Sequence, residues 1–124
     1  MAKILVVDDE GKIRDMFKSF FTKKGFDVIQ ASGGDEAISL LKIDEKIDLM
    51  VLDLRMPQTN GLDVLRRKKE LKDSRPVIVL TGITQVNFFV NLKEFGVESE
   101  DVLYKPFELD NILSLVKKKL NIDA

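Results

Sequence analysis

The feature that most constrains the fold of this chain is a regular alternation of short apolar runs with longer amphipathic segments. The apolar runs are rich in Val, Ile and Leu, which is typical of buried strands. In chain order they are Ile4–Val7, Val28–Ile29, Leu49–Leu52, Val77–Leu80 and Val102–Tyr104. Strands that alternate with helices pair in parallel, because each helical crossover returns the chain to the end of the sheet where the previous strand began. The sequence therefore predicts an α/β fold.

Two of the intervening segments carry apolar residues at helical spacing, and we expect both to pack on the sheet. These stripes are Ile13, Met16, Phe17, Phe20 and Phe21, and Leu109, Ile112, Leu113, Val116 and Leu120. Local signals mark the ends of elements. We expect Gly25 to end the first helix, Asp35 to cap the helix that carries Ala37, and Pro76 to open the fourth strand.

Polarity within the runs indicates the order of the strands. The runs around Val6, Val51 and Val79 show little polar alternation, as in central strands buried on both faces, whereas Val28 lies in a mixed segment nearer an edge. We expect a doubly wound five-stranded parallel sheet of order 2-1-3-4-5, a flavodoxin-like three-layer sandwich. A length of 124 residues suits one domain, residues 1–124.

Composition narrows the chemistry that the chain can perform. It has neither Cys nor His, so thiolate or imidazole ligands and His-based catalysis are excluded. Lys plus Arg number 20 and Asp plus Glu 21, a balance that gives no general attraction to nucleic acid. No stretch approaches the roughly 20 apolar residues of a membrane-spanning helix. We expect a cytoplasmic protein without membrane insertion or direct nucleic-acid binding.

Polar residues follow the predicted strands at their carboxyl ends. Asp8, Asp9 and Glu10 follow the first strand, Asp53 the third, Thr81 the fourth and Lys105 the fifth. In an open parallel sheet these ends meet at one edge, where ligands bind. Any one of these residues alone has a simpler explanation as a helix cap, a turn hydroxyl or a surface charge. Their combination at one edge predicts a site.

Carboxylates crowded together repel one another unless a cation compensates. Oxygen ligands without Cys or His favour Mg²⁺, which keeps several waters and so leaves room for a phosphoryl oxygen. With Thr81 as a hydroxyl donor and Lys105 as a cation, the set suits phosphoryl transfer. Asp53 would be the nucleophile and would form an acyl phosphate. This interpretation also requires that the Asp53 carboxylate is not sealed from solvent.

Four short motifs occur in order along nearly the whole chain. They are Asp8-Asp9, the stretch from Asp53 to Pro57 leading to Gly61, Thr81-Gly82, and Lys105-Pro106-Phe107. In these motifs the sequence resembles the receiver domain of bacterial response regulators, the chemotaxis regulators among them. Each motif alone is weak, but their order and their positions at strand ends make the resemblance specific.

The resemblance implies a role for each matching position. Asp53 would be phosphorylated and would bind Mg²⁺ together with Asp9, while Asp8 would act mainly through water. The backbone carbonyl of Arg55 would be a further ligand. Thr81 would follow the phosphoryl group on activation, and Lys105 would contact that group. The Lys105-Pro106 peptide bond would be cis.

The resemblance also implies a signalling switch rather than a metabolic enzyme. The donor would be a phosphohistidine on a sensor histidine kinase or a histidine phosphotransfer protein, and the chain would catalyse only its own phosphorylation and autodephosphorylation. Output would reach a downstream effector through the fourth helix, fifth strand and fifth helix, and a homodimer is one candidate assembly. One position departs from the family pattern, because Val102 stands where an aromatic residue is usual and Tyr104 lies nearby.

The segment after Thr81 has two apolar sides. We assign Phe88, Leu92 and Phe95 to the core. The opposite side contains Val86, Phe89 and Val90. It would be either a partner or dimer surface or part of a more deeply covered helix.

Two other functions fit part of this pattern. An aspartyl-phosphate phosphohydrolase of the haloacid-dehalogenase type needs a second acid two positions after its nucleophile, where this chain has Arg55. A flavin-binding protein of similar topology needs a phosphate-binding loop rich in Ser, Thr and Gly after the first strand, where the acids Asp8, Asp9 and Glu10 would repel phosphate. The phosphohydrolase remains the alternative.

Overall fold

A computed structural model describes residues 1–54, 61–82 and 92–122. Its elements are β1 (Lys3–Val7), α1 (Gly11–Lys23), β2 (Asp27–Ala31), α2 (Gly34–Ile43), β3 (Ile47–Asp53), α3 (Gly61–Glu70), β4 (Val77–Thr81), a 3₁₀ turn (Ser99–Asp101), β5 (Val102–Tyr104) and α5 (Leu109–Leu120). All strand pairs are parallel, and the strand order is β2-β1-β3-β4-β5. The predicted order is therefore confirmed, with Val28 on the edge strand β2.

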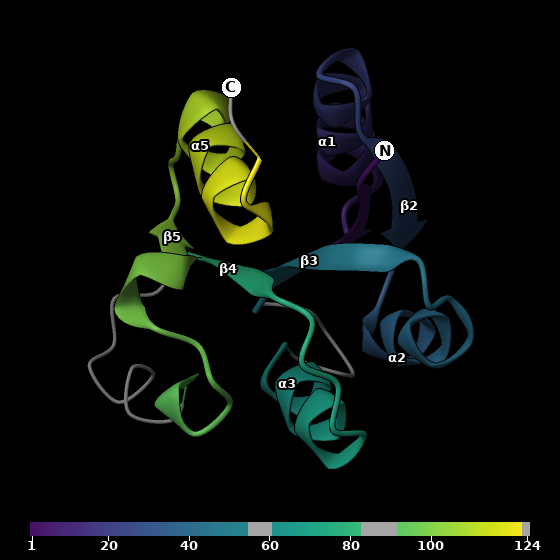
Figure 1. Ribbon diagram of the computed structural model, residues 1–124. Helices are drawn as coiled ribbons and strands as arrows, with labels where there is room; N and C mark the ends of the chain where they lie inside the picture. Colours follow the sequence, from purple (N-terminus) through teal and green to yellow (C-terminus); the bar gives the residue numbers. More distant parts are fainter. Residues whose placement is uncertain (55–60, 83–91, 123–124) are drawn as a thin grey trace.

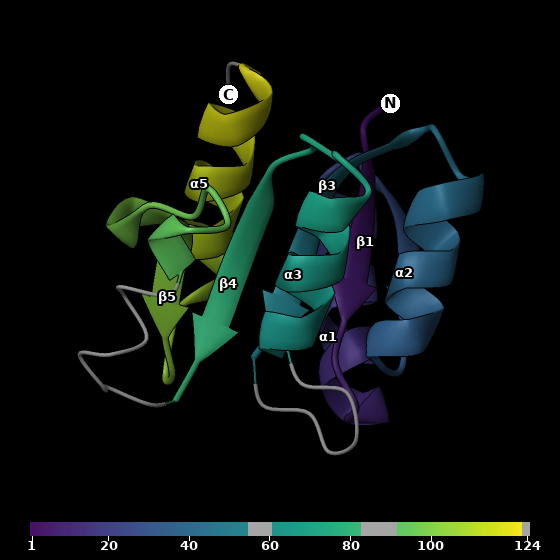
Figure 2. The ribbon, with the colours of Figure 1, turned by 90° about the horizontal axis from the view of Figure 1, so that it is seen from below.

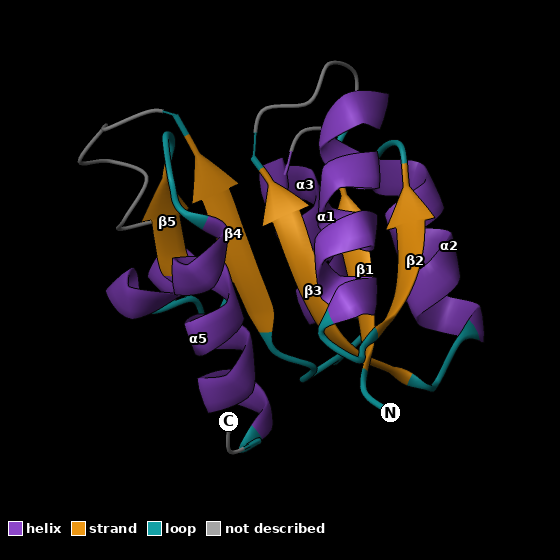
Figure 3. Ribbon diagram, turned by 90° about the horizontal axis from the view of Figure 1, so that it is seen from above, coloured by secondary structure: helices purple, strands orange, loops and turns teal. Residues whose placement is uncertain are grey.

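Helices cover both faces of the sheet. Figure 1 looks along the sheet and shows α1 and α5 on one side and α2 and α3 on the other. The arrowheads of the strands all point toward the same end of the sheet, and both chain ends lie at the opposite end (Figures 2 and 3). This arrangement is the predicted three-layer sandwich. No helix among the described residues has both the length and the apolar character needed to cross a membrane.

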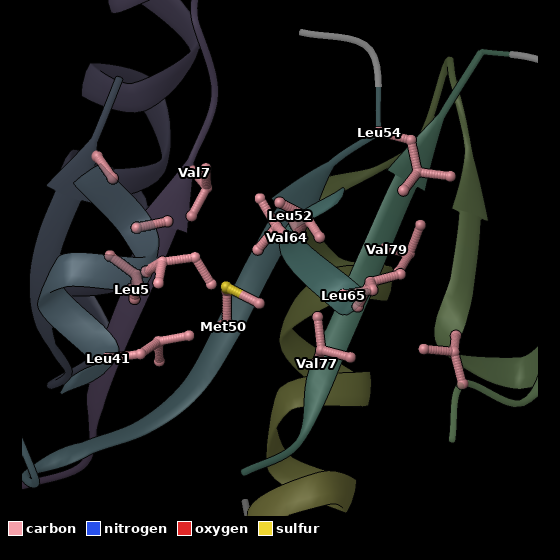
Figure 4. Packing of buried hydrophobic residues seen from close by; sticks show 14 of the residues in the cluster. Leu5, Val7, Leu41, Met50, Leu52, Leu54, Val64, Leu65, Val77 and Val79 are labelled. Atoms are coloured by element: carbon pink, nitrogen blue, oxygen red, sulfur yellow. The ribbon is translucent and has the colours of Figure 1, made fainter. Parts of the chain in front are cut away.

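Two apolar clusters fill the spaces between the layers. On the α2 and α3 side, Leu5, Met50 and Val79 of the strands pack against helix residues such as Leu65 (Figure 4). On the other side, Phe17 and Phe21 of α1 and Ile112 and Val116 of α5 are buried, as their spacing predicted. Strands buried on both faces explain why the central runs lack polar alternation.

The end of α1 follows the glycine signal. Gly25 has φ +93°, a left-handed conformation that favours glycine. The Gly25 N–H donates to the Thr22 carbonyl at 3.1 Å, and the Phe26 N–H donates to the Phe21 carbonyl at 3.0 Å. These bonds satisfy carbonyls at the helix end and return Phe26 to the core.

Two local predictions were wrong. Asp35 does not cap α2, because the cap position is Gly33 and Asp35 lies in the first turn, where its carboxylate pairs with Arg67 at 2.7 Å. Met16 of the apolar stripe is 36% exposed, since it lies at the margin of the buried face of α1. In the segment after β4, Leu92 is buried and Phe95 packs against the core as predicted. Positions 86, 88, 89 and 90 lie outside the described residues.

Candidate functional site

The parallel sheet brings the predicted site positions together at the carboxyl ends of its strands, which form the strand-end edge. Asp8 follows β1, Asp53 is the last residue of β3, Thr81 is the last residue of β4 and Lys105 follows β5. The strand arrowheads in Figure 3 mark this edge. Arg55, whose backbone carbonyl was predicted to bind the metal, lies outside the described residues.

Strand alternation divides the site between the two faces of the sheet. Asp53 lies two residues after Val51, on the α1 and α5 face. Thr81 lies two residues after Val79, on the α3 face, and Tyr104 packs in the same cluster as Val79. The carboxylate and the hydroxyl therefore approach the edge from opposite sides.

An ion pair joins β3 to the residue after β5. Lys105 Nζ donates to Asp53 Oδ2 at 3.2 Å, and the side chains are 34% and 3% exposed respectively. The Asp53 carboxylate is therefore nearly buried, with Lys105 over one of its oxygens, whereas the sequence interpretation expected it to be open to solvent. Lys105 lies against one carboxylate oxygen, so a reacting group that approaches that oxygen must displace a half-exposed, flexible side chain rather than a rigid element.

The polar groups of Asp8 are held from three directions. Its N–H donates to the Ala31 carbonyl of β2 at 3.2 Å, and its carbonyl accepts from Arg14 Nη1 at 2.7 Å. Its Oδ1 accepts from the Glu10 N–H at 2.9 Å. The other oxygen, Oδ2, is buried and has no hydrogen-bond partner among the described residues. A buried oxygen without a donor is a place where a cation would be stabilised.

Burial, together with the neighbouring Asp53 carboxylate, raises the pKa of Asp8 to about 6. The Glu10 N–H and Lys105 act in the opposite direction on this pKa but do not cancel the effect. Near neutral pH, the ionised Asp8 therefore destabilises the metal-free fold. A cation bound at this edge would relieve that cost.

We expect the Asp8→Asn variant to show this cost as a difference in pH dependence. Because the folded protein binds the Asp8 proton more tightly than the unfolded chain, the contribution of Asp8 to wild-type stability falls as the pH rises from about 4 through about 6. Asp8→Asn lacks this loss, so its stability relative to wild type should grow by about 2–3 kcal/mol over that range. Urea unfolding in EDTA measures the difference. The exposed Asp27→Asn serves as control, and parallel curves for Asp8→Asn and wild type would contradict the assignment.

Carboxylate oxygens gather immediately after β1. One oxygen each from Asp8, Asp9 and Glu10 lies within 4.8 Å of the others, and Asp9 and Glu10 are exposed. Such a set offers only hard oxygen donors, which suit Mg²⁺. The sequence analysis placed Glu10 at this strand end but did not include it among the predicted metal ligands.

Thr81 lies beside Tyr104 where β4 pairs with β5. The two residues are register partners, and the Lys105 N–H donates to the Thr81 carbonyl at 2.9 Å. Val102, at the position where the family usually has an aromatic residue, pairs instead with Val79 and is buried. The aromatic ring of β5, that of Tyr104, is thus two residues further along the strand, on the same face of the sheet. The Lys105-Pro106 bond is cis.

Gly61 begins α3 in close contact with the end of β3. A Cβ atom at this position would lie 2.6 Å from the Leu54 Cα and 3.0 Å from the Asp53 carbonyl oxygen. The Gly61 N–H donates to the Leu54 carbonyl at 3.1 Å. Only glycine allows the helix to start this close to the acidic edge.

Comparisons with known proteins agree with this geometry. The family model described as the response regulator receiver domain matches residues 4–117. The response regulator SaeR of Staphylococcus aureus is 38% identical over 125 residues, which cover 95% of this chain and 53% of SaeR. The chain therefore spans about half the length of the curated relatives it matches.

Solved structures share the whole fold. The receiver domain of the Francisella response regulator 1452 has a TM-score of 0.87 at 29% identity, with 98% of each chain covered. The chemotaxis protein CheY4 of Vibrio cholerae has a TM-score of 0.83 at 28% identity, covering 97% of this chain and 99% of its own.

Proposed function

This chain belongs to the response regulator receiver family of two-component signalling systems, and we propose that it accepts a phosphoryl group on Asp53 in a Mg²⁺-dependent reaction. We assign residues 1–124 to one receiver unit. The observation that carries the proposal is the position of the Asp53 carboxylate at the strand-end edge, where it acts on the carboxyl of Asp8 and pairs with the ammonium of Lys105. The Asp53 carboxylate lies between a like charge on Asp8 and the opposite charge on Lys105. An incoming phosphoryl group would take over the contact with Lys105.

The proposed Mg²⁺ ligands are Asp8, Asp9, Asp53 and the backbone carbonyl of Arg55. The Asp8 Oδ2 atom, which has no hydrogen-bond partner in the described part of the chain, and the all-oxygen donor set support this assignment. The exposed Glu10 carboxylate is close enough to assist. When bound, Mg²⁺ would neutralise charge on the phosphoryl oxygens and on the carboxylates around them.

The reaction transfers one phosphoryl group from nitrogen to oxygen. An oxygen of Asp53 forms a bond to phosphorus as the phosphorus–nitrogen bond of a donor phosphohistidine breaks, and the imidazole leaves. Lys105 would release Asp53 Oδ2 and pair with a phosphoryl oxygen, so its positive charge stays within the site. The Thr81 hydroxyl would donate to another phosphoryl oxygen.

The proposed donor is a sensor histidine kinase or a histidine phosphotransfer protein. We propose that output is a change in affinity for an effector or a second copy at the surface formed by the segment after Thr81, β5 and α5. The partner surface assigned to Val86, Phe89 and Val90 falls outside the described residues and remains a prediction.

Incubation with acetyl phosphate tests the proposal without a kinase. The wild-type protein should gain one phosphoryl group with Mg²⁺ and none with EDTA, as read by intact mass. An aspartyl-phosphate phosphohydrolase, the alternative, would instead turn over p-nitrophenyl phosphate many times per molecule. A protein that gains no phosphoryl group under either condition would contradict the proposal.

The position of Tyr104 predicts an optical signal. It is the only Tyr and the chain has no Trp, so intrinsic emission comes from the ring beside Thr81. If Thr81 moves toward the phosphoryl group, the packing around this ring changes. We expect Mg²⁺ with beryllium fluoride, an acyl phosphate mimic, to change the emission of wild type and of the exposed control Thr22→Ala. Thr81→Ala should lose most of the change, and an equal response in Thr81→Ala would refute the coupling.

A further inference from the structure

The side chain of Arg14 links the backbone of Asp8, at the carboxyl end of β1, to Gln30 of β2. Arg14 lies in the first turns of α1, three residues after Gly11, and its guanidinium forms two hydrogen bonds. Nη1 donates to the backbone carbonyl of Asp8 at 2.7 Å, and Nε donates to Gln30 Oε1 at 3.3 Å. Gln30 belongs to the edge strand β2 and is the register partner of Val6.

We propose that Arg14 is a positioning residue for Mg²⁺ binding: it fixes the peptide of Asp8 so that carboxylate oxygen Oδ2 faces the metal site. This inference rests on the function proposed above. Arg14 would contact neither the ion nor the phosphoryl group. It would act entirely through the backbone of Asp8.

The contacts favour orientation of the peptide over neutralisation of charge. Arg14 donates to the carbonyl of Asp8 rather than to its carboxylate. The N–H of Asp8 donates to Ala31, and its Oδ1 accepts from Glu10. The contact with Arg14 then holds the Asp8 carbonyl, the other polar group of its backbone. The free rotation that remains to the carboxylate is therefore small, and Oδ2 is held without a hydrogen-bond donor among the described residues.

The neighbours of Arg14 hold its guanidinium in turn. Gln30 supplies an acceptor from a second strand, so the planar group is bound at two separate nitrogen atoms. A Cβ built on Gly11 would lie 3.5 Å from Arg14 Nη2, which places the guanidinium directly against the start of α1. Lys at this position would keep the charge but could not present the same rigid pair of donors.

The test compares direct Mg²⁺ affinity in matched variants. Arg14→Ala and Lys12→Ala each remove one positive charge from α1, but Lys12 is exposed and has none of these contacts to Asp8 or Gln30 among the described hydrogen bonds. By calorimetric titration with MgCl₂ alone, Arg14→Ala should bind about tenfold more weakly or worse, as loss of an outer-shell contact to a ligand does. Lys12→Ala should stay close to wild type.

A second readout separates positioning from a purely structural role. At saturating Mg²⁺, the rate of phosphorylation of Arg14→Ala by acetyl phosphate should return to near the wild-type rate, because only the affinity for the ion is reduced. If Arg14→Ala does not fold, Arg14→Lys decides the question. Arg14→Lys should lose about threefold to tenfold in Mg²⁺ affinity, the equivalent of one hydrogen bond.

Three results would overturn the inference. They are Mg²⁺ binding by Arg14→Ala at wild-type affinity, an equal loss in Lys12→Ala, or wild-type affinity in Arg14→Lys when Arg14→Ala is unfolded. The proposed function fails differently, since the wild-type protein itself would then neither bind Mg²⁺ nor gain a phosphoryl group. A wild type that does both, beside an unaffected Arg14→Ala, would refute the role of Arg14 alone.

Discussion

The Asp53→Asn variant is expected to lose phosphorylation by acetyl phosphate completely. An amide is not a nucleophile toward phosphorus, and Asn matches Asp in shape, so the loss would come from chemistry and not from packing. The variant should remain folded, because neutralising Asp53 also removes its repulsion of Asp8. Intact mass of wild type and variant, after incubation with acetyl phosphate and Mg²⁺, measures the loss.

A control on the same strand sharpens this experiment. Asp48 also belongs to β3 but is exposed, and it accepts from the Lys3 N–H at 2.8 Å, away from the strand-end edge. Asp48→Asn should gain the phosphoryl group like wild type. Uptake by Asp53→Asn at the wild-type rate would assign the acceptor to another residue, and peptide mapping after borohydride reduction would identify it.

The second large effect is expected at the opposite edge of the sheet, where Arg75 joins three segments. Its guanidinium donates to the carbonyls of Leu41 and Asp44 at the end of α2, to the carbonyl of Ile47 at the start of β3, and to both oxygens of Asp73. The side chain of Asp73 is only 9% exposed. Burial alone would raise the pKa of Asp73, but its hydrogen bonds to Arg75 hold that pKa below the usual value.

Arg75→Ala should therefore lower the free energy of unfolding by roughly 3 kcal/mol or more, because it leaves a buried carboxylate and several carbonyls without their donor. Urea unfolding at neutral pH measures this loss. The matched control is Arg66→Ala, which breaks an exposed pair with Asp63 and should cost less than about 0.5 kcal/mol. Similar losses in the two variants would show that the Arg75 contacts contribute little, with Lys68 alone satisfying Asp73.

Much of the fold could be predicted because its signals are local and repeated. Each central strand is apolar on both faces, and each helix has a stripe, so the alternation indicates the architecture before any contact is known. Gly25 ended its helix as expected for the same reason, since a left-handed residue is a local requirement. The cap at Asp35 was wrong because a neighbouring glycine could take the cap position and leave the carboxylate to pair with Arg67.

The sequence by itself determined the strand order and the polar residue types that stand at the carboxyl ends of the strands. Only the tertiary structure decided the environment of those residues. It buries Asp53, raises the pKa of Asp8 and places Thr81 beside Tyr104. It also brings Arg14 into contact with the Asp8 carbonyl. Periodicity follows from the nearest few residues along the chain. Desolvation and hydrogen bonding depend on atoms that distant segments bring within a few ångströms, and no local pattern encodes those distances.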